Sequence, residues 1–60
     1  MKVIPNKNYK LVFQMGEALL TYTGKVLEVD FDSVKFIDKY RCVFCYQLSH
    51  LVSALEVGEA

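Results

Sequence analysis

The chain has 60 residues, is 53% hydrophobic, and has a formal net charge of zero because seven basic residues balance seven acidic ones. A single domain of this length gains little stability from its own core, and this much apolar surface favours burial by self-association. Zero net charge excludes a general positive field, so any nucleic-acid site has to be local. No apolar run reaches the roughly 18 residues of a membrane span, and the first residues lack a signal peptide's apolar core, so we expect a cytoplasmic protein with no membrane partner.

Residues 1–8 show no helical period, and they contain a proline, two asparagines and the cations Lys2 and Lys7. This composition is typical of irregular chain. We therefore expect a basic N-terminal arm, with Val3 and Ile4 extended along a neighbour.

The chain then alternates between apolar and polar side chains, with apolar residues at the odd positions Tyr9, Leu11, Phe13 and Met15. A period of two predicts a strand with one buried face over 9–15. Gly16-Glu17 then predicts a turn.

The longest predicted strand covers 18–30 and contains a change of phase. Its apolar row passes from even to odd positions after Gly24, from Leu20, Tyr22 and Val26 to Leu27, Val29 and Phe31. One extra residue in a strand is a bulge, and a glycine tolerates the bend that accompanies it. We therefore expect a strongly bent strand with Gly24 at the bend, a turn at Asp32-Ser33, and a hairpin partner over 33–38.

A third strand of this region is predicted over 41–48, after a hairpin tip at 38–40. One face carries Cys42, Phe44, Tyr46 and Leu48, and the other is also apolar because of Val43 and Cys45. A strand that is apolar on both faces is usually covered on both. So short a chain has little with which to cover it, which again favours self-association.

The tail has two interpretations that the local pattern does not separate. Helical spacing of its apolar residues, with Gly58 as a stop signal, favours a short helix: Leu48, Leu51, Val52 and Leu55. The alternative is a tight turn at Ser49-His50 followed by a strand over 51–57 whose odd positions face inward.

Two segments together resemble a known family. The first is the run G-K-V-L-E-V-D from Gly24 to Asp30. Its pattern is a glycine, any residue, an apolar residue, three further residues and an aspartate. Val34 and Phe36 follow four and six residues after Asp30. Downstream, F-C-Y-Q-L-S-H-L-V-S-A-L fits a strand, a short turn and a final strand. In order and spacing these segments resemble the two motifs of the Sm-like superfamily, which contains the Sm, LSm and Hfq proteins, and the resemblance covers residues 9–57.

The resemblance implies one domain over 1–60, with a basic arm at 1–8, a barrel at 9–57 and a tail at 58–60. The implied fold is all-β: a five-stranded, strongly bent antiparallel sheet closed into a small SH3-like barrel, with a strand rather than a helix over 51–57. In such proteins the fourth strand pairs with the fifth strand of the next subunit. Repetition of that contact closes a homo-oligomeric ring of roughly five to seven copies.

The same resemblance implies contact residues. Positions implied to contact RNA are Phe31, Asp32, Ser33, Tyr46, Gln47, Ser49 and His50. Positions implied at the subunit interface are Arg41, Val43, Cys45, Leu51 and Leu55. The chain departs from the family in this site, since it lacks the loop asparagine and has Gln47-Leu48 where arginine-glycine or lysine-histidine pairs are usual. The fold inference survives these changes, whereas the standard uridine pocket does not.

Other chemistry receives little support from the sequence. Cys42 and Cys45 have zinc-knuckle spacing, but a strand would point the two thiols to opposite faces, so we predict two small buried hydrophobic side chains. His50 is the only imidazole, and no nucleophile, base and orienting group occur together. We therefore expect no metal site, no cofactor and no enzyme activity.

Three carboxylates, Glu28, Asp30 and Asp32, share one face of the bent strand at spacings of two residues. Such a row is typical of a solvated face, with Lys25 or Lys35 opposite. The resemblance implies in addition that Asp30 braces the following loop by accepting backbone hydrogen bonds.

The sequence therefore predicts a homo-oligomeric Sm-like ring that acts as a non-catalytic, single-stranded RNA-binding or RNA-chaperone module. The alternative is a structural or assembly ring, phage-like in its brevity, that has lost RNA recognition. Zero net charge and the missing family residues favour the alternative, whereas the resemblance favours RNA binding.

Overall fold

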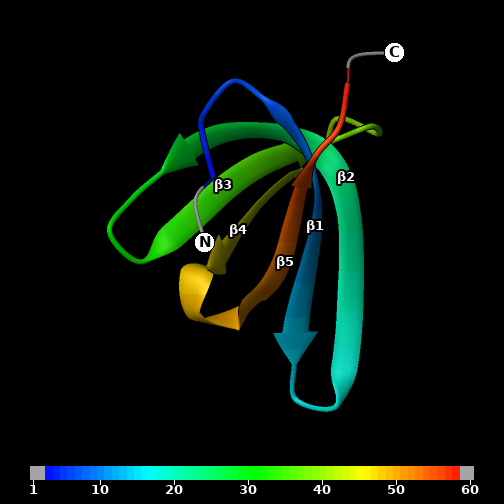
Figure 1. Cartoon of the computed structure of the whole chain (residues 1–60), viewed down its shortest axis with the longest axis vertical. Helices are drawn as coiled ribbons and strands as arrows, with labels where there is room; N and C mark the ends of the chain where they lie inside the picture. The colour runs from blue at the N-terminus through cyan, green and yellow to red at the C-terminus, as the bar shows by residue number, and fades with distance from the viewer. Residues whose placement is uncertain (1–2, 59–60) are drawn as a thin grey trace.

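The computed structural model describes residues 3–58. Within them, five strands join one antiparallel sheet in the order β4-β3-β2-β1-β5 (Figure 1). The elements are β1 (Asn8–Met15), β2 (Ala18–Val29), β3 (Ser33–Asp38), β4 (Val43–Gln47), the 3-10 turn η1 (Leu48–His50) and β5 (Leu51–Glu56). The predicted all-β, five-stranded antiparallel fold is confirmed, as is a strand in the tail. No helix in this part of the chain has the length and apolar character needed to cross a membrane.

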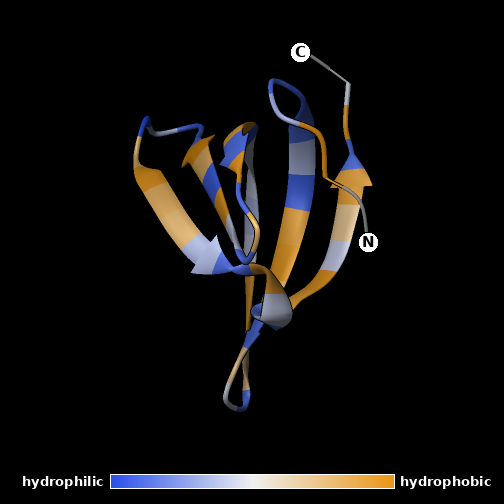
Figure 2. Ribbon diagram, turned by 90° about the vertical axis from the view of Figure 1, so that its left-hand side faces the viewer, coloured by the Kyte–Doolittle hydropathy of each residue, from blue (hydrophilic) through white to orange (hydrophobic). Residues whose placement is uncertain are grey.

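The sheet is strongly curled but open. β4 and β5 are its two outer strands, and no pairing between them occurs within residues 3–58. The expectation of a closed barrel is therefore wrong for the single chain. Figure 2 shows polar and apolar bands alternating along the strands, because successive side chains point to opposite faces of the sheet.

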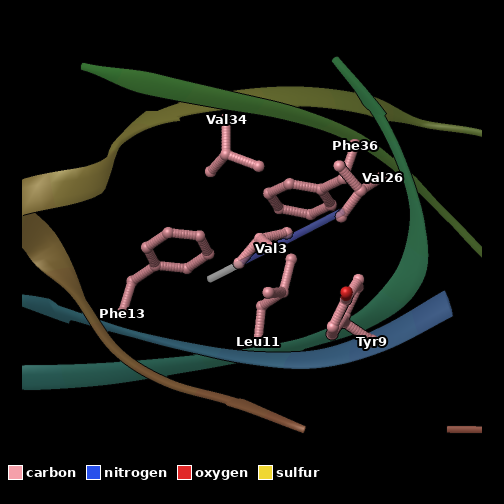
Figure 3. Packing of buried hydrophobic residues seen from close by; sticks show 7 residues of the cluster. All are labelled: Val3, Tyr9, Leu11, Phe13, Val26, Val34 and Phe36. Carbon is pink, nitrogen blue, oxygen red and sulfur yellow. The ribbon is translucent and has the colours of Figure 1, made fainter. Parts of the chain in front are cut away.

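The core lies on the hollow side of the sheet, where seven side chains pack together (Figure 3): Val3, Tyr9, Leu11, Phe13, Val26, Val34 and Phe36. β1 contributes three alternating residues of this set, as its sequence pattern predicts. Five of the seven are fully buried, among them both phenylalanines. The free energy of folding therefore depends on a few large side chains, since each fully buried one contributes roughly 1.5–3 kcal/mol.

The bulge of β2 and its glycine lie at different positions and have separate roles. Val26 pairs with Phe36 and Glu28 with Lys35, so the bulge lies at Leu27 rather than at Gly24. Gly24 has a different role: a Cβ there would collide with the carbonyl oxygen of Ile37 and lie 2.9 Å from its carbonyl carbon. The glycine is therefore required because the backbones of β2 and β3 approach closely at this point.

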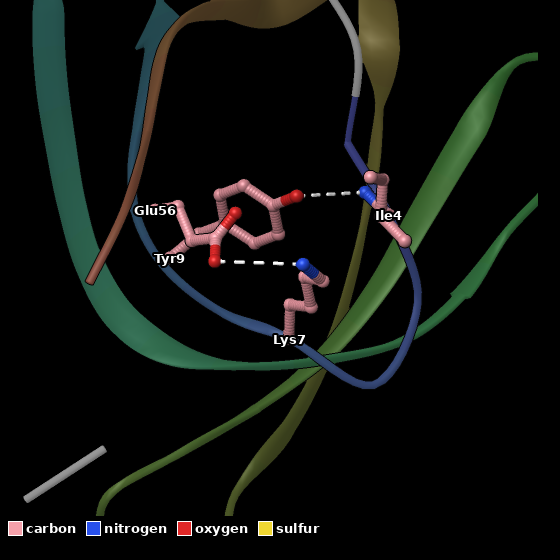
Figure 4. A network of polar contacts seen from close by, with 4 residues as sticks. All are labelled: Ile4, Lys7, Tyr9 and Glu56. Atoms are coloured by element: carbon pink, nitrogen blue, oxygen red, sulfur yellow. Dashed lines mark hydrogen bonds and ion pairs between the residues drawn. The ribbon is translucent and has the colours of Figure 1, made fainter. Parts of the chain in front are cut away.

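The N-terminal segment folds over its own sheet instead of along a neighbour. Val3 is 8% exposed and belongs to the core. The backbone N–H of Ile4 donates to the Tyr9 hydroxyl at 2.9 Å, and Lys7 Nζ lies 3.6 Å from Glu56 Oε2 (Figure 4). Met1 and Lys2, which the sequence assigns to the basic arm, lie outside the described residues.

β5 also contains an irregularity that the sequence pattern does not predict. Val12 pairs with Ser53 but Phe13 pairs with Leu51, so the register shifts by one residue between them. As a result Leu51 and Ala54 pack against the core, whereas Leu55 is 61% exposed. The prediction that all odd positions of 51–57 face inward is therefore wrong at Leu55.

Two tight turns join neighbouring strands. Gly16 has φ 63° at the first position of the two-residue turn between Met15 and Ala18, as a type II′ turn requires, which confirms the predicted turn. In the β3–β4 turn, Asp38 Oδ1 accepts hydrogen bonds from the backbone N–H groups of Tyr40 and Cys42, both at 2.9 Å. The Asp38 carboxylate thereby fixes the turn.

A pair of tyrosines joins β2 to β4 across the hollow side. The hydroxyls of Tyr22 and Tyr46 lie 2.7 Å apart, within an aromatic cluster with Phe13, Phe36 and Phe44. The hydrogen bond to Tyr46, and after it burial, raises the pKa of Tyr22 from 10.0 to about 12. The neutral phenol is therefore the form that the folded state favours.

This raised pKa predicts loss of stability in alkali. The folded state keeps the Tyr22 proton at pH values where the unfolded state releases it, so its contribution is complete below pH 10 and is lost as the pH rises through about 12. Tyr46→Phe should lower the free energy of unfolding at neutral pH by about 1 kcal/mol and flatten the alkaline decline. Guanidinium denaturation between pH 8 and pH 12 measures both effects; parallel curves for the two proteins would contradict the assigned role of the pair.

Candidate nucleic-acid interface

The loop between β2 and β3 lies against the end of β4. The backbone N–H of Leu48 donates to the carbonyl oxygen of Asp32 at 2.8 Å, and that of Asp30 donates to the carbonyl oxygen of Ser33, also at 2.8 Å. Ser33 also pairs with Gln47 across the β3–β4 ladder. The fold therefore brings the two sequence segments of the candidate RNA site together, and main-chain hydrogen bonds hold them.

Phe31 is the most conspicuous residue of this surface because its side chain is fully exposed (101%). Asp32, Gln47 and Ser49 are also exposed, and Ser33 and His50 are half-buried. We call this surface the loop surface; it consists of Phe31, Asp32, Ser33, Gln47, Ser49 and His50. An exposed aromatic ring can stack on a base, and amide, hydroxyl and imidazole groups such as those of Gln47, Ser49 and His50 can form hydrogen bonds to base edges.

Tyr46 is the one candidate RNA-contact residue that lies elsewhere. Its ring centroid is 4.7 Å from that of Phe13, and its hydroxyl bonds to Tyr22. The ring therefore lies in the aromatic cluster on the hollow side, apart from the loop surface.

The strand that leads into the loop is acidic. Glu28, Asp30 and Asp32 are all exposed, and Lys35 Nζ lies 3.7 Å from Glu28 Oε2. The prediction of a solvated face with Lys35 opposite is confirmed. The implied bracing by the Asp30 carboxylate is not found in residues 3–58, where the backbone N–H of Asp30 supports the loop instead.

The two cysteines differ from their predicted state. Cys42, in the turn before β4, and Cys45, on β4, are both exposed free thiols. The prediction of buried side chains is wrong, because β4 is an outer strand whose second face is uncovered in the single chain. Within residues 3–58, no three potential ligand side chains gather into a metal site.

All five candidate interface residues fall on or beside the two outer strands. Val43 is 55% exposed on β4 and Leu55 is 61% exposed on β5. Cys45 is also exposed, Arg41 lies in the β3–β4 turn with φ 66°, and Leu51 instead packs against the core. Sequence reasoning missed Val52, which is 49% exposed at the register shift of β5. The exposure of Val52 follows from the register of β5 with β1, which the local sequence pattern does not reveal.

Comparison of the chain with family models, with curated proteins and with solved structures gives no match. The function is therefore inferred from the chain's own geometry. That geometry offers an exposed aromatic ring for stacking, exposed hydrogen-bonding side chains on the segment that the loop contacts, and two strand edges that are unpaired within residues 3–58.

Proposed function

We propose that this chain is the subunit of a non-catalytic, homo-oligomeric Sm-like ring that binds single-stranded RNA on its loop surface. One observation carries the proposal: Phe31 is fully exposed on a loop that main-chain hydrogen bonds hold against the end of β4. A large apolar side chain in water adds nothing to the folding of the single chain, so its placement on a fixed loop supports a role in binding.

The outer strands support assembly. Each of β4 and β5 has one edge with unpaired backbone groups, which favours pairing with another chain. The two strands are similar in length, with five and six residues, and carry the exposed apolar residues Val43, Val52 and Leu55. If β4 of one copy pairs with β5 of the next, the contact is heterologous, and its repetition closes a ring.

RNA binding on the loop surface would depend on stacking more than on charge. Unpaired bases stack on aromatic side chains, and their edges accept and donate hydrogen bonds to groups such as the Gln47 amide and the Ser49 hydroxyl. Because the loop surface contains no lysine or arginine, we expect weak dependence of affinity on salt.

Phe31→Ala tests the stacking role. Loss of one base–aromatic stack, worth about 1–3 kcal/mol, should weaken binding of oligo-uridine and oligo-adenine RNA by roughly 5- to 150-fold. Fluorescence anisotropy at one fixed salt concentration measures the affinity. Leu19→Ala is the matched control, since Leu19 is 61% exposed on β2 and lies outside the loop surface. Equal affinities for the two variants would overturn the site.

A second candidate function is a structural ring that does not bind RNA. The acidic side chains before the loop, Asp30 and Asp32 among them, and the zero net charge of the chain favour it, because both repel or fail to attract phosphate. The same anisotropy titration separates the candidates: a wild-type protein that binds neither RNA at moderate salt supports the structural ring.

A further inference from the structure

We propose that the opposite end of the sheet binds a small organic phosphate in a shallow depression of about 300 Å³. The volume is near the lower limit for small-ligand pockets. Its lining residues come from the start of β1, the middle of β2, the end of β3 with the following turn, and the end of the described chain. This inference rests on neither ring assembly nor RNA binding.

The walls of the depression come from four segments that are distant in the sequence. Asn8, Lys25 and Ile37 stand side by side across β1, β2 and β3, so their side chains share one face of the sheet. Val57 joins them, since its backbone N–H donates to the carbonyl oxygen of Asn8 at 2.9 Å. Gly24 lines the depression without a side chain. The result is a depression with two half-buried apolar residues in its walls, Ile37 and Val57, and polar residues around them.

Two exposed lysines, Lys25 and Lys39, are among the residues that line this depression. The two ion pairs within residues 3–58 use other lysines, so neither of these cations has a carboxylate partner there. Lys39 Nζ lies 5.3 Å from the centroid of the Tyr40 ring. With Asp38 as the one acidic residue of the lining, the depression carries a net positive charge.

The one carboxylate in the lining, that of Asp38, offsets one of the two lysine charges and is oriented by the β3–β4 turn. Asp38 Oδ1 accepts two backbone hydrogen bonds within the β3–β4 turn. The acidic row that ends at Asp32 lies beyond the other end of β3, a strand of six residues that spans roughly 20 Å. The two ends of β3 thus carry charges of opposite sign, and an anion is attracted to the Lys25 end.

The ligand class follows from these groups. A phosphate group is attracted by lysine side chains such as those of Lys25 and Lys39, and the lining residues Asn8 and Thr23 carry an amide and a hydroxyl that can donate hydrogen bonds to its oxygens. The apolar part of the ligand would contact Ile37 and Val57. A nucleoside monophosphate has both parts and serves as the probe.

Titration of the full chain with adenosine monophosphate, followed by amide chemical shifts in NMR, tests the proposal. We expect saturable shifts at Thr23, Gly24, Lys25 and Lys39. Lys25→Gln and Lys39→Gln should each weaken binding about tenfold or more, since each removes a charge-assisted contact. Lys10→Gln is the matched control: Lys10 is exposed on β1 but does not line the hollow, and its variant should bind within about twofold of wild type.

Three results would overturn the proposal: shifts that stay linear up to millimolar ligand, equal binding of adenosine and its monophosphate, or equal weakening by Lys10→Gln and Lys25→Gln. The first means no site, the second no phosphate recognition, and the third attraction by general charge alone. Inorganic phosphate added alone should bind more weakly than the monophosphate, because it lacks the apolar part. Equal binding would show that Ile37 and Val57 do not contact the ligand. Failure here leaves the Phe31→Ala comparison unaffected.

Discussion

A single methyl group added at position 24 is expected to abolish folding of this chain. The Cβ of Gly24→Ala would collide with backbone atoms of Ile37 and lie 3.0 Å from the Cα of Asp38. Backbone atoms cannot move aside as a flexible side chain can, so β2 and β3 would have to separate, at a cost of about 3 kcal/mol or more. The whole stability of a 60-residue chain is about 3–9 kcal/mol, at roughly 0.05–0.15 kcal/mol per residue.

The measurement is thermal unfolding followed by circular dichroism, together with the dispersion of the NMR amide spectrum. Gly24→Ala should show no cooperative transition. Gly58→Ala is the matched control and should match wild type, because a Cβ there meets nothing within 4 Å. Gly16→Ala should fold with a loss of about 1–2 kcal/mol, because its φ of 63° strains a residue with a side chain. A Gly24→Ala protein as stable as Gly58→Ala would show that the strands do not approach as described.

Val43→Lys is expected to convert the proposed ring into folded monomers. Val43 begins the outer strand β4 and is 55% exposed in the single chain, so a lysine there leaves the monomer's own core untouched. At a β4–β5 contact between subunits, the same lysine would bury an unpaired ammonium group, which costs several kcal/mol per contact. Because every subunit contact in a ring is equivalent, the cost recurs around the assembly.

Sedimentation velocity measures the change in mass, and circular dichroism checks that the fold is retained. Leu19→Lys is the matched control, because Leu19 is 61% exposed on the inner strand β2 and lies on neither outer strand. It should keep the wild-type mass. An undiminished mass for Val43→Lys would exclude the start of β4 from the subunit contact.

Local sequence pattern predicts the strands well where polar and apolar residues alternate without interruption. β1 and β3 come close to this pattern: each carries a row of apolar residues that ends in the core, such as Leu11 and Phe13 or Val34 and Phe36, and only Val12 and Ile37 depart from the alternation. The turn at Gly16 is equally local, because its conformation depends on one residue's φ. These features need no knowledge of which strands pair.

Features that depend on pairing are not accessible in this way. The bulge at Leu27 and the shift at Val52 each arise from the register with a neighbouring strand. The tail shows the same limit, because its apolar spacing fits a helix and a strand equally until pairing with β1 selects the strand. The exposure of Leu55 follows from that shift and could not be predicted without it.

The loop surface was partly predictable. Ser33 and Gln47 must lie together once β3 and β4 form a hairpin, so the meeting of the two segments follows from chain order. The position of Tyr46 could also have been inferred, because it shares an alternating row with Phe44, which faces the hollow side. The depression around Lys25 could not, since four segments that are distant in the sequence build it.

Native mass spectrometry, with and without short oligo-uridine and oligo-adenine RNA, tests the central claim most directly. We predict one closed oligomer of fixed subunit number that retains RNA at moderate salt. An oligomer that ignores both RNAs would contradict RNA binding and favour the structural ring. A monomer at all concentrations would contradict the assembly itself, and with it the proposal that β4 and β5 are the contact strands.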